Sequence, residues 1–193
     1  MYKHFHRRNL PHLYFSDGIY FITSRLINSI PVDKLEQLQS ETKNTNDEKL
    51  KRLFQKYDAL MDSGEYGEKY LKIPECADVV KTTLHYPDRK DYNLISYCIM
   101  PNHFHLVFKL LPLNKGISKI MQSIKRISAR DCNKILKRTG AFWQDESFDR
   151  WVRDEKELYY VIRYVLLNPV NAGLVDDWRD WQFTYCHPDY LIL

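Results

Sequence analysis

Two adjacent β-forming segments, separated only by Pro101 and Asn102, constrain the fold more than any other feature of this chain. In an extended strand, residues i and i+2 point to the same face. One face of the second segment is therefore apolar, with Phe104, Leu106, Phe108 and Leu110. The opposite face carries His103, His105, Val107 and Lys109. The tight connection predicts an antiparallel pair of strands at about 92–100 and 103–110.

Further elements flank this pair and set the expected topology. In chain order we predict a strand at 19–26, a helix from about 74 to 84, the two strands, a basic helix within 115–138, a strand near 147–152 and a helix at about 154–167. Strand, helix, strand, strand, helix, strand is the split βαβ order. We therefore predict an α+β, ferredoxin-like antiparallel sheet with helices on one face. The other face should stay open, and His103 and His105 should project from it.

The stretch 33–70 does not fit this order and is predicted to be a helical insertion. It is charged, contains Gln and Asn, and has leucines at helical spacing. We find no internal repeat or low-complexity tract elsewhere, so residues 1–193 are expected to form a single domain.

The composition argues against a membrane protein, a secreted protein and a disulfide-rich protein. No apolar run approaches the roughly 20 residues that span a membrane, and the N-terminal residues lack the apolar middle of a signal peptide. The 4 cysteines are scattered without a CxxC pair, which argues against a disulfide framework and a zinc knuckle. We expect a cytoplasmic protein with reduced thiols and no membrane partner.

The pair His103 and His105 is the strongest candidate for a metal site, because two imidazoles on one strand face can reach one ion. A zinc site that adds Cys98 is an alternative reading. The triplet His4-Phe5-His6 has the same spacing but lies at a terminus that we expect to be frayed. We interpret that triplet as a look-alike or as a DNA-contacting arm.

A second feature is the cationic helix within 115–138, where basic residues stand against Asp131 alone. Isoleucines recur at helical spacing in the same segment, so the basic side chains form its outer face. The candidate DNA contacts are Lys109, on the histidine face of its strand, together with Lys119, Lys125, Arg126 and Arg130. A phosphate backbone is a plausible partner, and a solvated basic helix without a ligand is the alternative.

The last predicted helix contains a third feature. Successive residues of a helix are rotated by ~100° about its axis. Tyr164 is therefore rotated about 110° from the centre of the apolar stripe, so it is not an obvious core aromatic. Asn168 follows four residues later on the same face. Because Pro169 disfavours helical geometry in the residue before it, we expect Asn168 at the helix end, with its amide oxygen free to bind.

These motifs together resemble a known family. A His-hydrophobic-His triplet after Met-Pro-Asn, followed by Tyr164-x-x-x-Asn168-Pro-Val-x-Ala-Gly-Leu-Val, resembles the REP-associated tyrosine transposases and related single-tyrosine HUH transposases of insertion-sequence-200 type. The resemblance covers most of the chain, from about 14 to 183. It departs from compact members in the length of the 33–70 stretch.

The resemblance implies a DNA transposase that cleaves and rejoins single-stranded or hairpin DNA through a 5′-phosphotyrosine. Tyr164 matches the nucleophile, His103 and His105 match the metal ligands, and Asn168 matches the third, amide ligand. The implied cofactor is Mg²⁺ or Mn²⁺, and the implied state is a monomer or a homodimer. The alternative is a domesticated DNA-binding or regulatory module that keeps this fold without strand transfer.

Overall fold

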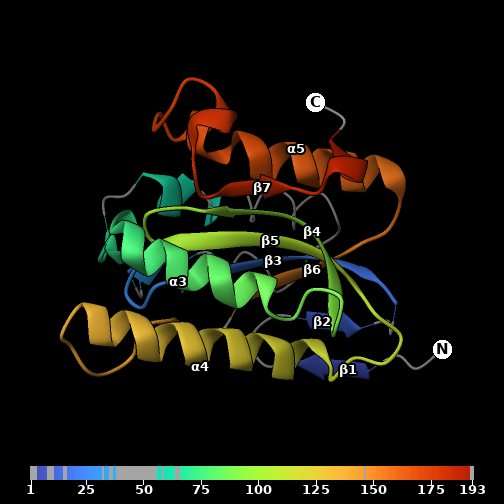
Figure 1. The fold of residues 1–193 in the computed structure, drawn as a ribbon, viewed down its shortest axis with the longest axis horizontal. Coiled ribbons are helices and arrows are strands. Elements are labelled where there is room, and N and C mark those ends of the chain that lie inside the picture. The colour runs from blue at the N-terminus through green and yellow to red at the C-terminus, as the bar shows by residue number, and fades with distance from the viewer. Residues whose placement is uncertain are drawn as a thin grey trace.

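In the described part of the chain, five strands form one antiparallel sheet (Figure 1). Across the sheet they are β6 (Phe148–Val152), β3 (Ile19–Arg25), β5 (His103–Leu110), β4 (Tyr92–Ile99) and β7 (Thr184–Cys186). Every neighbouring pair is antiparallel. The predicted α+β class and the strand pair around Pro101 are therefore confirmed. β7 adds an edge strand that the sequence did not predict.

The computed structural model describes residues 4–7, 11–14, 17–31, 33–34, 37, 56–57, 59–63, 66–145 and 147–191. For 4–7 and 11–14 it describes the backbone alone. Where the predicted insertion at 33–70 is described, it is helical at 33–34, at 37 and at 56–62 with gaps, it is not helical at 63 and 66–69, and residue 70 begins a 3₁₀ helix. The prediction for the other residues of the stretch lies outside the described ones.

Helices α3 (Pro74–His85) and α4 (Ile117–Ile135) pack together on one face of the sheet (Figure 1). Pro74 stands at the first helical position of α3, where its fixed φ suits a helix start. The core beneath these helices combines Ile22, Leu106 and Phe108 from the strands, Val80 and Leu84 from α3, and Ile120 and Ile124 from α4. The apolar face predicted for β5 is thus the face that these two helices cover.

Helix α5 (Glu155–Asn171) lies across the opposite face, above the sheet in Figure 1. Asp154 caps its start by accepting a 2.8 Å hydrogen bond from the Glu157 amide. Leu158, Ile162, Val165 and Leu166 of α5 pack against Phe21, Ile95 and Val107 of the sheet. The expectation of an open face is therefore wrong. An apolar sheet face must be covered, and Phe21, Ile95 and Val107 make this face apolar around the histidines.

A β-bulge in β4 decides which of its side chains reach the α5 face. The register with β5 shifts between Leu94 and Ser96. Leu94 packs with the α3 and α4 core, whereas Cys98 and Met100 belong to the α5 core. Without the bulge, Leu94 and Cys98 would share a face, because side chains alternate with period two.

Helix α5 also ends later than predicted. It continues through Pro169 to Asn171, so Asn168 lies inside the helix. The chain then turns at Gly173, whose φ is +66°. The Leu174 amide donates to the Pro169 carbonyl and the Gly173 amide to the Val170 carbonyl, which is a Schellman ending. These bonds satisfy the carbonyls of Pro169 and Val170 in the last turn, whereas Pro169 itself has no amide to donate to the carbonyl four residues before it.

The chain begins with a separate hairpin of β1 (His4–Arg7) and β2 (Pro11–Tyr14). The His4-Phe5-His6 triplet is thus in a paired strand, not at a frayed end. The remaining elements are the 3₁₀ helices η1 (Tyr70–Lys72), η2 (Trp178–Asp180) and η3 (Pro188–Tyr190). No helix among the described residues has the length and apolar character needed to cross a membrane.

Candidate metal and tyrosine site

The two histidines of β5 face each other under α5. Both side chains are fully buried, and the Nε2 atoms of His103 and His105 are 3.1 Å apart. His103 Nδ1 lies 2.7 Å from the Asn102 Oδ1 atom, and His105 Nδ1 lies 2.8 Å from the Thr23 hydroxyl. Because an amide oxygen only accepts, His103 carries its proton on Nδ1 and presents a lone pair on Nε2.

The Thr23 hydroxyl allows His105 either tautomer, because it can donate to Nδ1 or accept from it. When the hydroxyl accepts, the Nε2 atoms of both histidines present lone pairs to the same space. Such outer hydrogen bonds to Nδ1 are the usual means of orienting metal-binding imidazoles. Asn102 and Thr23 therefore orient the two rings as metal ligands require.

Burial keeps both imidazoles neutral. It lowers the pKa of His103 to about 3. Burial also lowers the pKa of His105 well below its ordinary value, and the proximity of His103 lowers it further. A neutral imidazole is the form that binds a metal ion. The pair is thus in its metal-binding form at neutral pH.

Helix α5 places Tyr164 and Asn168 over this pair. The half-buried Tyr164 ring meets the His105 ring edge-on, with 5.3 Å between centroids. A second edge contact, at 6.0 Å, joins it to Phe21. Asn168 Nδ2 donates to the Tyr164 hydroxyl at 3.1 Å, whereas the buried Asn168 Oδ1 has no hydrogen-bond partner among the described residues.

Asp62 is a member of the site that the sequence analysis missed. Its Oδ1 atom lies 3.7 Å from His103 Nε2 and has no hydrogen-bond partner in the described part of the chain. Burial raises the pKa of Asp62 to about 7, and the neighbouring Asn168 amide offsets only part of that rise. We interpreted 33–70 as a surface insertion, and no local pattern distinguishes this aspartate from the other charged residues of that stretch.

The donor set fits a divalent ion with mixed nitrogen and oxygen ligands. Two nitrogens bound at about 2.1 Å and at right angles to each other are separated by roughly 3.0 Å, close to the spacing of the two Nε2 atoms. The unsatisfied Asn168 oxygen belongs to a side chain that contacts Tyr164 and Asp62, each of which contacts one of the histidines. A cavity of about 140 Å³, lined in part by Asp62, Lys69, Lys72 and His103, opens next to the pair.

The zinc reading with Cys98 is not supported. Cys98 lies opposite His105 in the strand register, but its thiol contacts Met100 Sδ at 3.6 Å and the Thr184 hydroxyl at 3.5 Å. No three His, Cys, Asp or Glu side chains of the described residues form a group able to hold a metal. An amide ligand is therefore needed.

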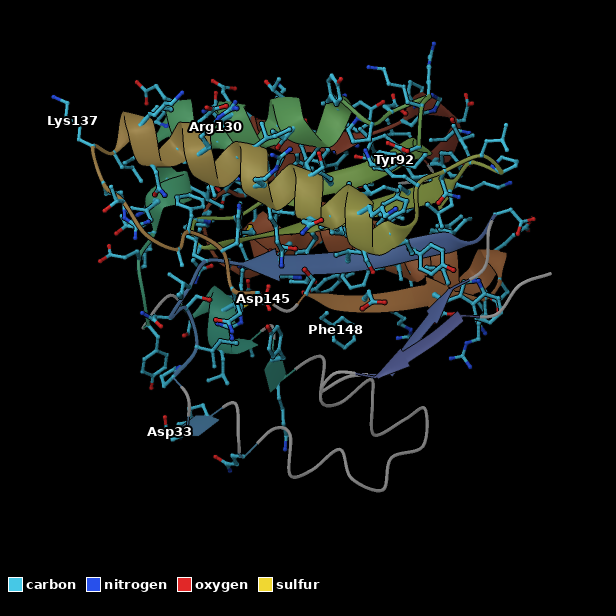
Figure 2. The ribbon with its side chains drawn as sticks, turned by 90° about the horizontal axis from the view of Figure 1, so that it is seen from below. Asp33, Tyr92, Arg130, Lys137, Asp145 and Phe148 are labelled. Carbon is cyan, nitrogen blue, oxygen red and sulfur yellow. The ribbon has the colours of Figure 1, made fainter. Side chains whose placement is uncertain are left out.

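The basic helix lies away from these residues, since α4 covers the other face of the sheet. Figure 2 shows α4 from its outer side, with Arg130 on the helix and Lys137 in the turn after it. Lys119 and Arg126 are exposed. Lys109 is also exposed, near the far end of β5.

Two of the predicted DNA contacts are engaged within the chain. Lys125 donates to the carbonyls of Gln144 and Asp145 at 2.8 and 2.9 Å. Arg130 forms a two-point pair with Asp131. Lys119 and Arg126 are therefore better candidates for phosphate contacts on α4 than Lys125 and Arg130.

Comparison with known proteins identifies the class to which this fold and site belong. The family model described as "Transposase IS200 like" matches residues 64–166, which include His103, His105 and Tyr164. The chain belongs to this family of transposases.

Two curated relatives and one solved structure are similar to the chain. A candidate REP-associated tyrosine transposase of Haemophilus influenzae is 29% identical over 119 residues, 56% of this chain and 65% of that protein. The REP-associated tyrosine transposase of Escherichia coli is 25% identical over 100 residues, 52% of this chain and 58% of that protein. This chain thus matches less than two thirds of either relative.

The solved structure is that of a REP-associated tyrosine transposase bound to a REP hairpin. It is 17% identical, with a TM-score of 0.59, and the match covers 93% of this chain and 80% of that one. At this level of identity the likeness concerns the fold.

Proposed function

We propose that this protein is a metal-dependent transposase that cleaves and rejoins single-stranded or hairpin DNA, with Tyr164 as the nucleophile. The observation that carries the proposal is the contact of Tyr164 with both parts of the candidate metal site. Its ring meets His105, and its hydroxyl accepts from Asn168. Membership of the transposase family supports the same reaction class.

In the proposed cleavage step, the Tyr164 oxygen attacks the scissile phosphorus. The new bond joins Oη to phosphorus, and the bond from phosphorus to the 3′ oxygen breaks. The phenol gives up its proton and the leaving 3′ oxygen takes one up. The products are a 5′-phosphotyrosine and a free 3′-hydroxyl. Attack by another 3′-hydroxyl on the phosphotyrosine reverses the step and joins the strands, so no nucleotide cofactor is needed.

Asn168 has two roles in this proposal. Its Nδ2 donates to the Tyr164 oxygen, which holds the nucleophile in place and stabilises a phenolate. Its Oδ1 atom, together with His103 and His105, would hold the Mg²⁺ or Mn²⁺. The bound ion would supply Lewis acidity toward the phosphate oxygens. Mn²⁺ suits mixed nitrogen and oxygen ligands well.

The DNA partner is proposed from charge and from the structural relative. That relative is bound to a REP hairpin. In this chain the exposed Lys119 and Arg126 on α4 would contact the phosphate backbone, and Lys109 would do so near the far end of β5. Because α4 lies on the other face of the sheet from Tyr164, these contacts would bind DNA away from the cleaved bond.

We propose that one chain holds a complete site. Tyr164 meets His105 of its own chain, without a partner subunit. This arrangement favours a monomer that cleaves with its own tyrosine over a homodimer that exchanges tyrosine helices.

The test is a cleavage assay with labelled single-stranded hairpin DNA and Mn²⁺ or Mg²⁺. Wild type should yield a covalent protein–DNA adduct that survives denaturation and is lost in Tyr164→Phe and His103→Ala. The matched control is Tyr160→Phe, the same change one turn earlier on α5, at a side chain that is 57% exposed. Tyr160→Phe should retain the adduct.

Two results would reject the assignment. An adduct that persists in Tyr164→Phe would exclude this residue as the nucleophile. Hairpin binding by wild type without any metal-dependent adduct would instead favour the DNA-binding module that has lost strand transfer.

A further inference from the structure

Four potential metal-binding atoms belong to described side chains that are linked by contacts, from His105 to His103, from His103 to Asp62 and from Asp62 to Asn168. They are the Nε2 atoms of His103 and His105, which are 3.1 Å apart, and the buried Oδ1 atoms of Asn168 and Asp62. Asp62 Oδ1 lies 3.7 Å from His103 Nε2. The two oxygens have no hydrogen-bond partner among the described residues, which is costly for buried acceptors, and a cation held with the Nε2 atoms would satisfy both.

We infer that Asp62, which lies outside the paired histidine motif and the tyrosine helix, is a further ligand of the divalent ion. This inference rests on the proposed function, because it concerns the same ion. It also gives the end of the 33–70 insertion a role, which is to supply the only charged ligand of the site among the described residues.

Charge balance is the first argument for this ligand. His103, His105 and Asn168 are all neutral ligands, so on their own they would leave a buried ion with its full +2 charge. One carboxylate reduces the total to +1, and one phosphodiester then brings it to zero. A site completed by Asp62 therefore binds the ion and still favours one negatively charged phosphate.

The second argument is that Asp62 has no cation of its own in the described structure. Among the described residues its single ion-pair contact is with His103, whose Nδ1 faces the Asn102 amide oxygen and whose Nε2 therefore presents a lone pair, not a proton, to Asp62. Lys69 and Lys72 line the same cavity, but both are exposed and neither is ion-paired with Asp62 among the described residues. A bound cation would stabilise this carboxylate, whose Oδ1 atom is buried.

The third argument is that the surrounding chain fixes the position of Asp62. Arg25 is 3% exposed and donates from Nε to the Tyr57 hydroxyl at 2.7 Å. Asn102 Nδ2 donates to the Met61 carbonyl at 2.9 Å. The segment before Asp62 is thus attached to the end of β3 and to the residue that also orients His103. Asp62 lies at the histidine pair because these contacts hold it there.

Asp62 and the histidines alone do not form a complete three-residue metal group in the described structure. The set is a mixed one, of two imidazoles, an amide and a carboxylate. Such a set suits Mg²⁺ or Mn²⁺ better than zinc, because two of its four ligands are hard oxygens.

The test measures Mn²⁺ binding to the full-length protein, without DNA, by the loss of the free-ion electron paramagnetic resonance signal. Asp62→Asn keeps the size of the side chain and removes its charge. We expect it to weaken Mn²⁺ binding at least about tenfold, in line with losses seen when groups around a metal are changed. Glu68→Gln is the matched control. It is the same kind of change at an exposed acid of the same stretch, and it should bind as wild type does.

A second measurement separates a ligand from a structural residue. Thermal unfolding in a chelator should show Asp62→Asn at least as stable as wild type, because the variant removes an unpaired buried charge. Added Mn²⁺ should raise the melting temperature of wild type more than that of Asp62→Asn. A structural role predicts the opposite in the chelator, namely destabilisation.

The failure of this inference is distinguishable from failure of the proposed function. If Asp62→Asn binds Mn²⁺ as tightly as wild type while His103→Ala does not, the metal site stands and Asp62 is not a ligand. If wild type and His103→Ala bind Mn²⁺ equally, or wild type binds none, the metal site itself is refuted and this inference falls with it. Destabilisation of metal-free Asp62→Asn would also overturn the ligand role.

Discussion

Asn102→Ala offers the sharpest test of how the sheet orients the histidines, because one buried side chain has two roles. Asn102 is 2% exposed. Its Oδ1 atom accepts from His103 Nδ1 at 2.7 Å, and its Nδ2 atom donates to the Met61 carbonyl at 2.9 Å. The substitution removes both hydrogen bonds and leaves a buried donor and a buried acceptor without partners.

The expected cost follows from these two orphaned groups. Each buried polar group left without a partner costs about 1–3 kcal/mol, so the free energy of unfolding should fall by roughly 2–6 kcal/mol. For a chain of this length, each 1 kcal/mol lowers the melting temperature by about 2–4 °C, which predicts a drop of about 4–24 °C. Mn²⁺ affinity should fall by about 10–100-fold, because the His103 ring is no longer oriented.

The assays are chelator-treated thermal unfolding and Mn²⁺ binding, with Thr23→Val as the comparison. That variant keeps the side-chain shape and removes only the hydroxyl that bonds His105 Nδ1 at 2.8 Å. It should lower the melting temperature less than Asn102→Ala does. A loss below about 2 °C in Asn102→Ala would refute the assigned hydrogen bonds. Unchanged Mn²⁺ affinity would refute the orienting role.

Three further predictions concern assembly, pH and thiol reactivity. Mixing Tyr164→Phe with His103→Ala should restore no adduct if one chain holds the whole site, whereas a dimer that exchanges tyrosines would regain about a quarter of wild-type sites. Burial raises the pKa of Cys98 to about 12 and of Cys186 to about 11, both from 9.0. Since both folded-state values are raised, stability should be full below pH 9 and fall as pH rises from 9 to 12, as denaturant unfolding would measure. Native thiols should also react slowly with Ellman's reagent at about pH 8, and rapid labelling without unfolding would contradict their burial.

The sheet was predictable because its signals are local. Alternation in β5 assigned Phe104 and Leu106 to one face and His103 and His105 to the other, as the two cores confirm. Period-two alternation depends only on backbone geometry, so a single sequence contains it. The same holds for the outer face of α4, whose buried residues recur at helical spacing.

The covering of the histidine face was not predictable in the same way. α5 has an apolar stripe, but the stripe does not specify which sheet face it covers. The β4 bulge also has no signal of its own, although it brings Cys98 to the α5 face. The helix end was mispredicted for a different reason. The preference against helix before Pro169 is weak, and packing of Asn168 and Pro169, both buried, outweighs it.

The position of Asp62 beside the histidine pair could not be predicted from the sequence alone. Its contact with His103 joins residues 41 positions apart in the chain, through an insertion whose composition resembles a solvated surface. Only the hydrogen bonds from Arg25 and Asn102 to that segment reveal that it returns to the sheet. Such long-range placement is set by tertiary contacts and leaves no periodic pattern.

Buried polar atoms are usually hydrogen-bonded, and the exceptions in this protein need an explanation. Among the described residues, three buried side-chain oxygens lack a hydrogen-bond partner, on Asp62, Glu157 and Asn168. The Glu157 oxygen is compensated, because it forms an ion pair with Arg150. The other two lie beside the histidine pair. If the chain were selected for stability alone, these acceptors would be paired or replaced, since each costs about 1–3 kcal/mol. Under the proposed function, a bound ion would satisfy both of these oxygens.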